Sequence, residues 1–260
     1  MSASTCLGRK HERRPDVDPD GAAVPMTAHG VVYLVPNLLG VVPPEDVLPK
    51  RTLDVARSLE HWLVETPKPA RAFIKSVGSS RPIAALSIVS MSGGSTSIDP
   101  LLAPARDGHD IGILSDAGCP GIADPGAQVV AAAHAAGLRV VPLVGPSSLL
   151  LALMAAGMNG QRFSFHGYLP VRADARDAAL RRLEAESRAA HCTQLFIETP
   201  YRNAALLEAI VQTLAPATRV CVAADVTLPT ESIETRSARD WRRVDAQRYA
   251  KRPAIFLLEA

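Results

Sequence analysis

Residues 115–126 combine small, stiff and acidic side chains in an order that suits the binding of a ligand. They read Ser-Asp-Ala-Gly-Cys-Pro-Gly-Ile-Ala-Asp-Pro-Gly and follow the apolar run at residues 111–114. Glycines let the backbone approach a ligand closely, and prolines stiffen the loop, so that binding costs little ordering entropy. The same composition fits an elaborate turn between a strand and a helix, in which Asp124 caps a helix at residues 126–136.

A second loop of the same kind follows a second apolar run. Residues 140–144 lead into Gly-Pro-Ser-Ser and then directly into an apolar helix, which Ser147 or Ser148 could cap. Because parallel strands end at one edge of a sheet, the two loops are expected to lie side by side and form a crevice. The pair therefore favours a ligand site over turn chemistry, although neither loop is a G-x-G-x-x-G dinucleotide fingerprint.

The elements that must hold these loops alternate between strand and helix. Apolar runs that end in small or polar residues predict strands buried on both faces, at residues 31–35, 62–64, 86–89, 111–114 and 140–144. Helical spacing between them predicts helices at residues 52–60, 69–77 and 127–136. This alternation indicates an open, mostly parallel sheet with its ligand loops at the carboxyl ends of the strands.

After residue 157 the alternation of strands and helices becomes less regular, which predicts a second unit. Helices are expected at residues 176–190 and 203–214, and strands at residues 193–198, 219–223, 230–235 and 254–259. The predicted fold is therefore α/β, with an N-terminal α/β domain at residues 28–145 and a C-terminal α/β domain with a mixed sheet at residues 146–260. Residues 1–27 are polar and lack apolar periodicity, which predicts a disordered N-terminal extension.

Composition argues against several classes of protein. The 28 basic and 26 acidic side chains give a formal charge of +2, which is not a general signature of nucleic-acid binding. Aromatic residues make up only 4% of the chain, which argues against a stacking platform like those of single-strand binders. Four widely spaced cysteines form no CxxC pair, so the sequence predicts no metal site and a reducing, cytoplasmic location. No stretch predicts a signal peptide or a membrane span.

Three segments together resemble the tetrapyrrole methylase superfamily of S-adenosylmethionine-dependent methyltransferases. They are residues 115–126, Val-Val-Pro-Leu-Val-Gly-Pro-Ser-Ser from residue 140, and Phe-Ser-Phe-His-Gly-Tyr-Leu-Pro from residue 163. Within the superfamily the chain is most similar to the branch of the bacterial 16S rRNA ribose 2′-O-methyltransferases. Phe-Ile-Glu-Thr-Pro-Tyr-Arg at residues 196–202 extends the similarity to that branch.

This resemblance implies a fold, a cofactor and partners. It implies two α/β domains with S-adenosyl-L-methionine in the cleft between them, a homodimer, a ribosomal RNA substrate, and neither a metal nor a membrane. Carried over residue by residue, it predicts that the cofactor contacts Pro36, Leu38, Ser115, Asp116, Ala117, Gly118, Ile122, Ser147, Phe196, Ile197, Ala223, Pro253 and Ala254. Cys119 stands where the family usually has threonine, and it would be reactive only with a depressed pKa.

The catalytic base remains open among several residues. Methyl transfer needs in-line positioning and exclusion of water, and a base helps when the acceptor is a hydroxyl. Asp116 and Glu65 are the predicted catalytic carboxylates, and His166 is a further candidate base. The alternative for Asp116 is an Asx turn in which its carboxylate satisfies its own loop.

The acceptor side is predicted from three residues. Arg71, His166 and Arg202 are expected to bind the acceptor. Each has a structural alternative, because a lone histidine beside aromatic residues is often structural, and Arg202 could pair with Glu198 at i, i+4. Residues 236–252 hold seven basic and two acidic residues, which fits either RNA phosphates or a solvated helix face.

Two segments depart from the rRNA-modifying branch, and both lie where the acceptor should bind. Residues 64–71 carry additional prolines, and residues 88–94 contain neither histidine nor an acidic residue. Two alternatives therefore stay open. The acceptor could be a small tetrapyrrole-like or other metabolite, or the chain could be a regulatory module that binds the cofactor without catalysis.

Overall fold

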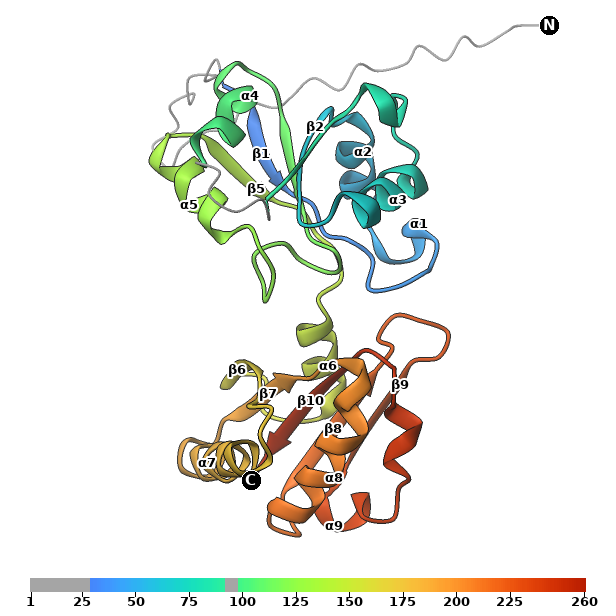
Figure 1. The fold of residues 1–260 in the computed structure, drawn as a ribbon, viewed down its shortest axis with the longest axis vertical. Helices are drawn as coiled ribbons and strands as arrows, with labels where there is room; N and C mark the ends of the chain where they lie inside the picture. Colours follow the sequence, from blue (N-terminus) through green and yellow to red (C-terminus); the bar gives the residue numbers. More distant parts are fainter. Residues whose placement is uncertain (1–28, 92–97) are drawn as a thin grey trace, which may run out of the picture.

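The computed structural model describes residues 29–91 and 98–260, and it folds into two halves, each built on a five-stranded sheet (Figure 1). The predicted N-terminal extension at residues 1–27 lies outside the described residues, as does the end of the divergent segment 88–94. The predicted α/β class, with a parallel first sheet and a mixed second sheet, is confirmed. No helix within the described ranges is long and apolar enough to cross a membrane.

The first sheet has the strand order β3-β2-β4-β1-β5, and all of its strand pairs are parallel. Its strands are β1 (Val31–Leu34), β2 (His61–Val64), β3 (Ser87–Ser90), β4 (Ile111–Leu114) and β5 (Arg139–Pro142). Every residue of β4 is buried, as expected for a central strand covered on both faces. β5 ends two residues earlier than the apolar run, which continues as the loop to the second half.

Short helices cover both faces of this sheet. They are α1 (Pro44–Val47), α2 (Lys50–Ser58), α3 (Pro67–Val77), η1 (Ile83–Ala85), η2 (Asp99–Leu102), α4 (Ala103–Arg106) and α5 (Ala127–Ala135). The expectation that Asp124 caps the following helix is wrong. α5 begins at Ala127 after Gly126, whose φ of 133° is open to glycine, and no side chain caps it.

The second sheet has the order β6-β7-β10-β8-β9, with β6 parallel to β7 and the other pairs antiparallel. Its elements are α6 (Ser148–Ala156), β6 (Phe163–Tyr168), α7 (Ala173–Ala190), β7 (Thr193–Ile197), η3 (Pro200–Arg202), α8 (Asn203–Thr213), β8 (Arg219–Ala224), β9 (Ser232–Ser237), α9 (Ala238–Trp241), η4 (Ala246–Tyr249) and β10 (Ala254–Glu259). The sequence pattern missed β6, because this edge strand alternates aromatic with small or polar residues and lacks an apolar run.

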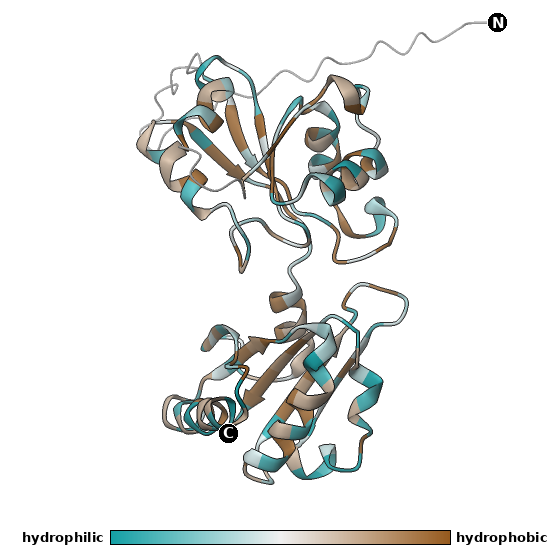
Figure 2. Cartoon of the chain, in the orientation of Figure 1, coloured by the Kyte–Doolittle hydropathy of each residue, from teal (hydrophilic) through white to brown (hydrophobic). Residues whose placement is uncertain are grey.

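The two faces of the second sheet bury different clusters. Phe196 and Phe256 stack at 6.0 Å on the face that packs against α7 and α8. Leu195, Ala223 and Ile255 lie on the other face, where α6 packs. Figure 2 shows the apolar residues concentrated on the strands and on α6. Because side chains alternate along a strand, this pattern decides which residues can reach a ligand beside α6.

Candidate functional site

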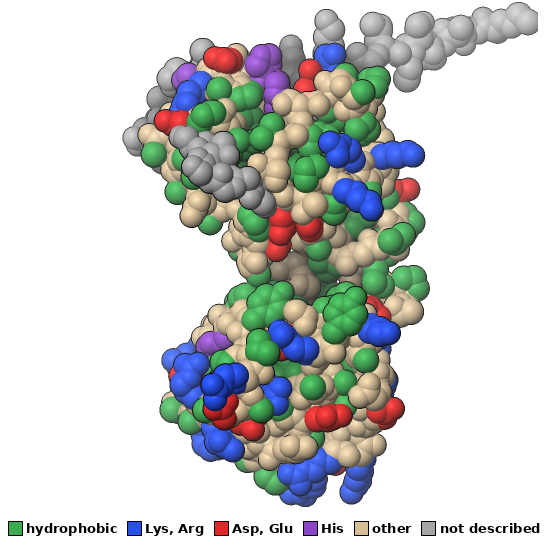
Figure 3. All heavy atoms as spheres, viewed as in Figure 1, with side chains coloured by type: hydrophobic (Ala, Val, Ile, Leu, Met, Phe, Trp, Pro, Cys, Tyr) green, Lys and Arg blue, Asp and Glu red, His purple; other side chains and the backbone are tan. Residues whose placement is uncertain are grey.

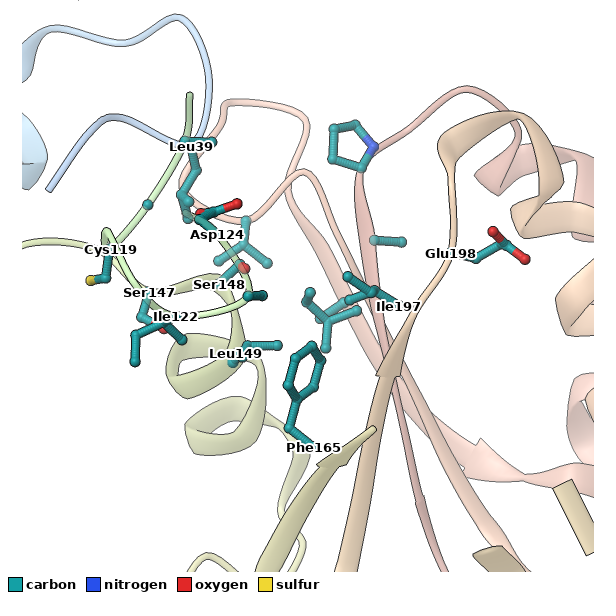
Figure 4. A pocket seen from close by; sticks show the side chains of 18 of the residues that line it. Leu39, Cys119, Ile122, Asp124, Ser147, Ser148, Leu149, Phe165, Ile197 and Glu198 are labelled. Atoms are coloured by element: carbon teal, nitrogen blue, oxygen red, sulfur yellow. The ribbon is translucent and has the colours of Figure 1, made fainter. Parts of the chain in front are cut away.

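A pocket of about 280 Å³ lies where the two halves meet, and it has two distinct walls (Figure 4). The loop wall comes from the first half and consists of Leu39 and residues 117–119 and 122–124. The strand wall comes from the ends of β6, β7 and β8 and the start of β10, and includes Phe165, Tyr168, Ile197, Ala223, Pro253, Ala254 and Ile255. Ser147, Ser148 and Leu149 at the start of α6 line the pocket between the walls.

Asn37 fixes the shape of the loop wall. This side chain is 5% exposed, and its Nδ2 donates to the carbonyl oxygens of Ser115 at 2.9 Å and Asp116 at 3.0 Å. Its backbone N–H donates to the Gly118 carbonyl at 2.8 Å. The sequence reasoning did not name Asn37 as a site residue, although a polar residue in the loop after a buried strand was a usable signal.

Gly118 is a position of the loop wall where a side chain would strain the backbone. Its φ is 66°, in the left-handed region that favours glycine. A Cβ at this position would lie 3.3 Å from the Leu39 side chain and 3.7 Å from the Pro146 carbonyl oxygen. The loop is therefore pressed between two segments that also border the pocket.

Glu65 and Asp116 join the ends of β2 and β4 behind this wall. The backbone N–H of Asp116 donates to Glu65 Oε2 at 3.0 Å, and the N–H of Thr66 donates to Asp116 Oδ1 at 3.1 Å. The Asx-turn expectation for Asp116 is therefore wrong, since its carboxylate satisfies the neighbouring loop instead of its own. Neither of these predicted catalytic carboxylates lines the pocket.

Asp124 is the carboxylate of the loop wall that does line the pocket. Burial raises the pKa of Asp124 to about 6, the negative charges of Glu65 and Asp116 add to the rise, and a hydrogen bond with Ser115 opposes it. Figure 4 shows Asp124 and Ser148 on the same side of the pocket. The sequence reasoning assigned Asp124 to a helix cap and so missed it, because only the tertiary fold brings the other two carboxylates close.

The loop between β1 and α1 reaches the pocket through one residue. Pro36 is buried, and a Cβ on Gly145 would lie 2.4 Å from the Pro36 Cβ, so these two residues pack backbone against ring. Leu38 packs in the core of the first half, whereas Leu39 packs against the α6 cluster and lines the pocket. Of this loop, the pocket thus holds Leu39 in place of the predicted Pro36 and Leu38.

The strand wall differs from the prediction at Phe196. Ile197 and Ala223 line the pocket, together with Pro253 and Ala254. Phe196 is fully buried on the opposite face of β7, because neighbouring side chains of a strand point to opposite faces. The prediction that the Phe196 side chain contacts the ligand is therefore wrong for a ligand in this pocket.

The predicted cofactor residues divide into two groups. Those that the structure brings together around the pocket are Ala117, Gly118, Ile122, Ser147, Ile197, Ala223, Pro253 and Ala254. Ser115 and Asp116 lie behind the loop wall, with the Ser115 hydroxyl 3.1 Å from the Ala117 carbonyl oxygen. The structure thus gathers most of the predicted set at one place and moves the rest into supporting positions.

The predicted acceptor residues do not form one cluster. Arg202 Nη2 lies 2.6 Å from Glu198 Oε1, so the i, i+4 ion pair is present beside pocket residue Glu198. His166 Nε2 lies 2.6 Å from Gln194 Oε1 on the neighbouring strand, which supports its structural alternative. Arg71 is exposed on α3 in the first half, away from both.

Local contacts bear on two further expectations. Burial and then the charge of Asp124 raise the pKa of Cys119, which argues against the reactive-thiol alternative at this position. In the basic segment 236–252, Arg236 and Arg248 pair with Glu234, and Arg252 pairs with Asp225. Much of that charge is thus compensated within the second half. In the part of the chain that the structure describes, no group of three or more His, Cys, Asp or Glu side chains could hold a metal ion.

The architecture defines the class of the protein, an α/β fold of two sheets whose strand ends share one pocket. The family model described as Tetrapyrrole (Corrin/Porphyrin) Methylases matches residues 51–240. The chain therefore belongs to this family, and it is a methyltransferase. The resemblance inferred from the loops at residues 115–126 and 140–148 is confirmed.

Sequence relatives and a solved structure agree with this placement. Relatives named ribosomal RNA small subunit methyltransferase I occur in Escherichia coli O157:H7, at 33% identity over 79% of this chain and 68% of the relative, and in Xylella fastidiosa, at 33% identity over 70% of this chain and 63% of the relative. The chain thus spans about two thirds of their length. The crystal structure of the methyltransferase CobJ has a TM-score of 0.58 at 20% identity, covering 88% of this chain and 94% of that chain, and so supports the fold.

Proposed function

We propose that the pocket binds S-adenosyl-L-methionine and that the protein transfers its methyl group to a ribose 2′-hydroxyl of small-subunit ribosomal RNA. The observation that carries the cofactor assignment is the contrast between the two walls. An adenine ring fits the apolar strand wall at Ile197, Ala223 and Ile255, and a cationic sulfonium fits the acidic loop wall. The names of the relatives carry the assignment of the RNA.

We assign the role of general base to Asp124. When bound, S-adenosyl-L-methionine would supply an electrophilic methyl group, and the sulfur of the cofactor would take the electrons of the broken carbon–sulfur bond as a neutral thioether. The carboxylate of Asp124 accepts the proton of the attacking hydroxyl, and the electron pair of the O–H bond forms the new bond from oxygen to carbon. A pKa of about 6 leaves Asp124 ionised at neutral pH and still basic enough to help. Asp116 and Glu65 act from behind, by holding the two loops together and by raising that pKa.

The cofactor assignment can be tested by calorimetric titration with S-adenosylhomocysteine. Wild-type protein should bind, and Ala117→Glu, which puts a charged side chain into the pocket from an exposed position, should weaken binding at least about tenfold. Ala84→Glu is the matched control, because Ala84 is exposed and does not line the pocket. A wild-type protein that gives neither heat nor a thermal shift with this ligand would refute the assignment.

The acceptor can be tested with labelled cofactor and small ribosomal subunits from a host strain that lacks the gene. Label should enter the RNA at one nucleotide, and the adjoining phosphodiester should resist alkali, because a methylated 2′-oxygen cannot attack it. Label in a tetrapyrrole or another metabolite would favour the alternative acceptor. Cofactor binding without any labelled product would favour a regulatory module.

We also propose that the two units join at residues 145 and 146 and that the protein acts as a cytoplasmic homodimer. The last strand of the first sheet ends at Pro142, and the first helix of the second half begins at Ser148, which supports that boundary. Light scattering of the purified protein distinguishes a monomer from a dimer. Fractionation of host cells distinguishes the cytoplasm from other compartments.

A further inference from the structure

Of the four tyrosines of the chain, one lines the pocket and another directly follows a residue that lines it. Tyr168, the last residue of β6, lines the pocket and is 61% exposed. Tyr201 follows pocket residue Pro200 and is 81% exposed. The low overall content of aromatic residues thus hides a local concentration, because a globular protein ordinarily buries most of the area of such rings.

A β-bulge aims Tyr168 at the pocket. Phe165 pairs with Leu195 and Tyr168 with Ile197, so three residues of β6 advance against two of β7. Without the extra residue, Phe165 and Tyr168 would point to opposite faces of the sheet. Gly167 takes a φ of 63° inside the bulge, and both rings therefore line the same pocket.

Hydrogen bonds hold the turn that carries Tyr201 and Arg202. The N–H of Arg202 donates to the Thr199 carbonyl at 2.9 Å, and the N–H of Lys251 donates to the Pro200 carbonyl at 2.8 Å. Glu198, whose side chain is 3% exposed, accepts from the N–H of Thr199 at 2.6 Å as well as from Arg202. The turn is therefore held in one conformation by these hydrogen bonds.

Arg202 retains unused hydrogen-bond donors. Only its Nη2 is bound by Glu198, and its Nε is buried without a partner among the described residues. The side chain as a whole is 41% exposed, so part of the guanidinium faces solvent. A guanidinium held on one side in this way is suited to a phosphate on the other.

The opposite rim of the pocket carries negative charge. Figure 3 shows acidic side chains at the edge of the first half, across the hollow from hydrophobic and basic side chains of the second half. A phosphate is therefore attracted to the side of Arg202 and repelled from the side of Asp124. The flat, uncharged base of a nucleotide can stack on the tyrosine rings. The ribose of that nucleotide would then lie between the two rims.

We propose that Tyr168 and Tyr201 stack on the base of the acceptor nucleotide, which enters unpaired and unstacked, while Arg202 binds its phosphate. This proposal rests on the proposed function, since it specifies how the same pocket receives RNA. A 2′-hydroxyl in a continuous helix lies beside neighbouring nucleotides, whereas a splayed nucleotide can reach into a pocket. The substrate class is thus single-stranded or bulged RNA, with a paired helix excluded from the site.

The first experiment compares Tyr201→Phe with Tyr201→Leu, and the same two changes at Tyr168, in the full chain. Phenylalanine keeps the ring and should keep the KM for RNA within about twofold, whereas leucine should raise the KM about tenfold, since it removes the ring on which the base would stack. Phe163→Leu is the matched control, because Phe163 is 43% exposed on the same strand and does not line the pocket. The Tyr201 and Phe163 variants, whose residues do not line the pocket, should keep the wild-type affinity of S-adenosylhomocysteine to within a few-fold.

The second experiment titrates the protein, saturated with S-adenosylhomocysteine, into a short single-stranded RNA that carries one 2-aminopurine. Its fluorescence should be quenched, and the complementary duplex should bind at least about tenfold more weakly.

Leucine variants with the wild-type KM, or equal binding of the duplex, would overturn the proposal while leaving the proposed function intact. If the wild-type protein methylates no RNA, the proposed function itself fails. Tyrosine-dependent binding of a carboxylated porphyrin in place of RNA would overturn both assignments of the acceptor.

Discussion

The two walls of the pocket are built by different physical means. The loop wall depends on backbone hydrogen bonds, positive φ angles and charge, with Asn37 and Gly118 at its base. The strand wall depends on apolar packing and on the alternation of side chains along β7, β8 and β10. In the proposed function the loop wall therefore carries the chemistry, while the strand wall sets shape and affinity.

The largest expected effect is on the loop wall, in Asp124→Asn. Loss of a general base should lower kcat about 100-fold or more, while binding of S-adenosylhomocysteine persists. Asp116→Asn is the comparison variant and should lower kcat less than about tenfold, because its side chain lies outside the pocket and asparagine still accepts from Thr66. In the wild-type protein kcat should fall below a pH of about 6, following the pKa of Asp124. The reverse ranking of the two variants would assign the base to Asp116.

The next largest effect tests how the loop wall is held. Asn37→Ala removes the bonds from Nδ2 to the carbonyls of Ser115 and Asp116, of which the first is buried, and the bond that Oδ1 accepts from the N–H of Leu38. The free energy of unfolding should fall by about 2 kcal/mol, as measured by denaturant titration. Asn159→Ala, which loses solvent-exposed side-chain hydrogen bonds at a half-buried position of the second half, should lower it less. Equal losses would mean that the loop wall is no more constrained than an ordinary turn.

A smaller effect concerns the stability that Asp124 gives up at neutral pH. Its folded pKa of about 6 lies above its unfolded value, so its contribution favours the folded state at low pH and is lost as the pH rises through 6. Asp124→Asn should therefore raise the free energy of unfolding by about 1 kcal/mol at pH 8, after allowance for solvent screening, and by nothing near pH 4. Thermal denaturation at the two pH values measures the difference. A gain that does not depend on pH would contradict this origin.

The smallest effect is expected at Cys119. Its thiol donates to the Pro146 carbonyl at 3.5 Å, and a threonine hydroxyl can make the same bond. Cys119→Thr should therefore change the free energy of unfolding by less than about 0.5 kcal/mol and kcat by no more than about twofold. Because the pKa of this thiol is raised, iodoacetamide should also label it slowly at neutral pH. Fast labelling, or a large loss of activity in the variant, would give Cys119 a chemical role.

How much of the molecule the sequence could predict differs between the walls. Apolar runs predicted the strands of the first sheet and most elements of the second, because burial on both faces leaves a direct mark in the sequence. The pattern missed β6, whose alternation of aromatic with small or polar residues contains no such run. It also misplaced Phe196, because a motif match does not state which face of a strand a residue occupies.

The sequence by itself determined the fold class, the glycine-rich loops and the family, since these depend on local spacing and residue type. Only the tertiary structure brought out the contacts of Asn37 and the surroundings on which the proposed roles of Asp124 and Tyr168 rest. The pKa of Asp124 depends on carboxylates that lie far away along the chain, and Asn37 binds a loop nearly 80 residues distant. A bulge against β7 aims Tyr168. Charge, hydrogen bonding and the direction of a side chain act through space, and spacing along the chain does not record them.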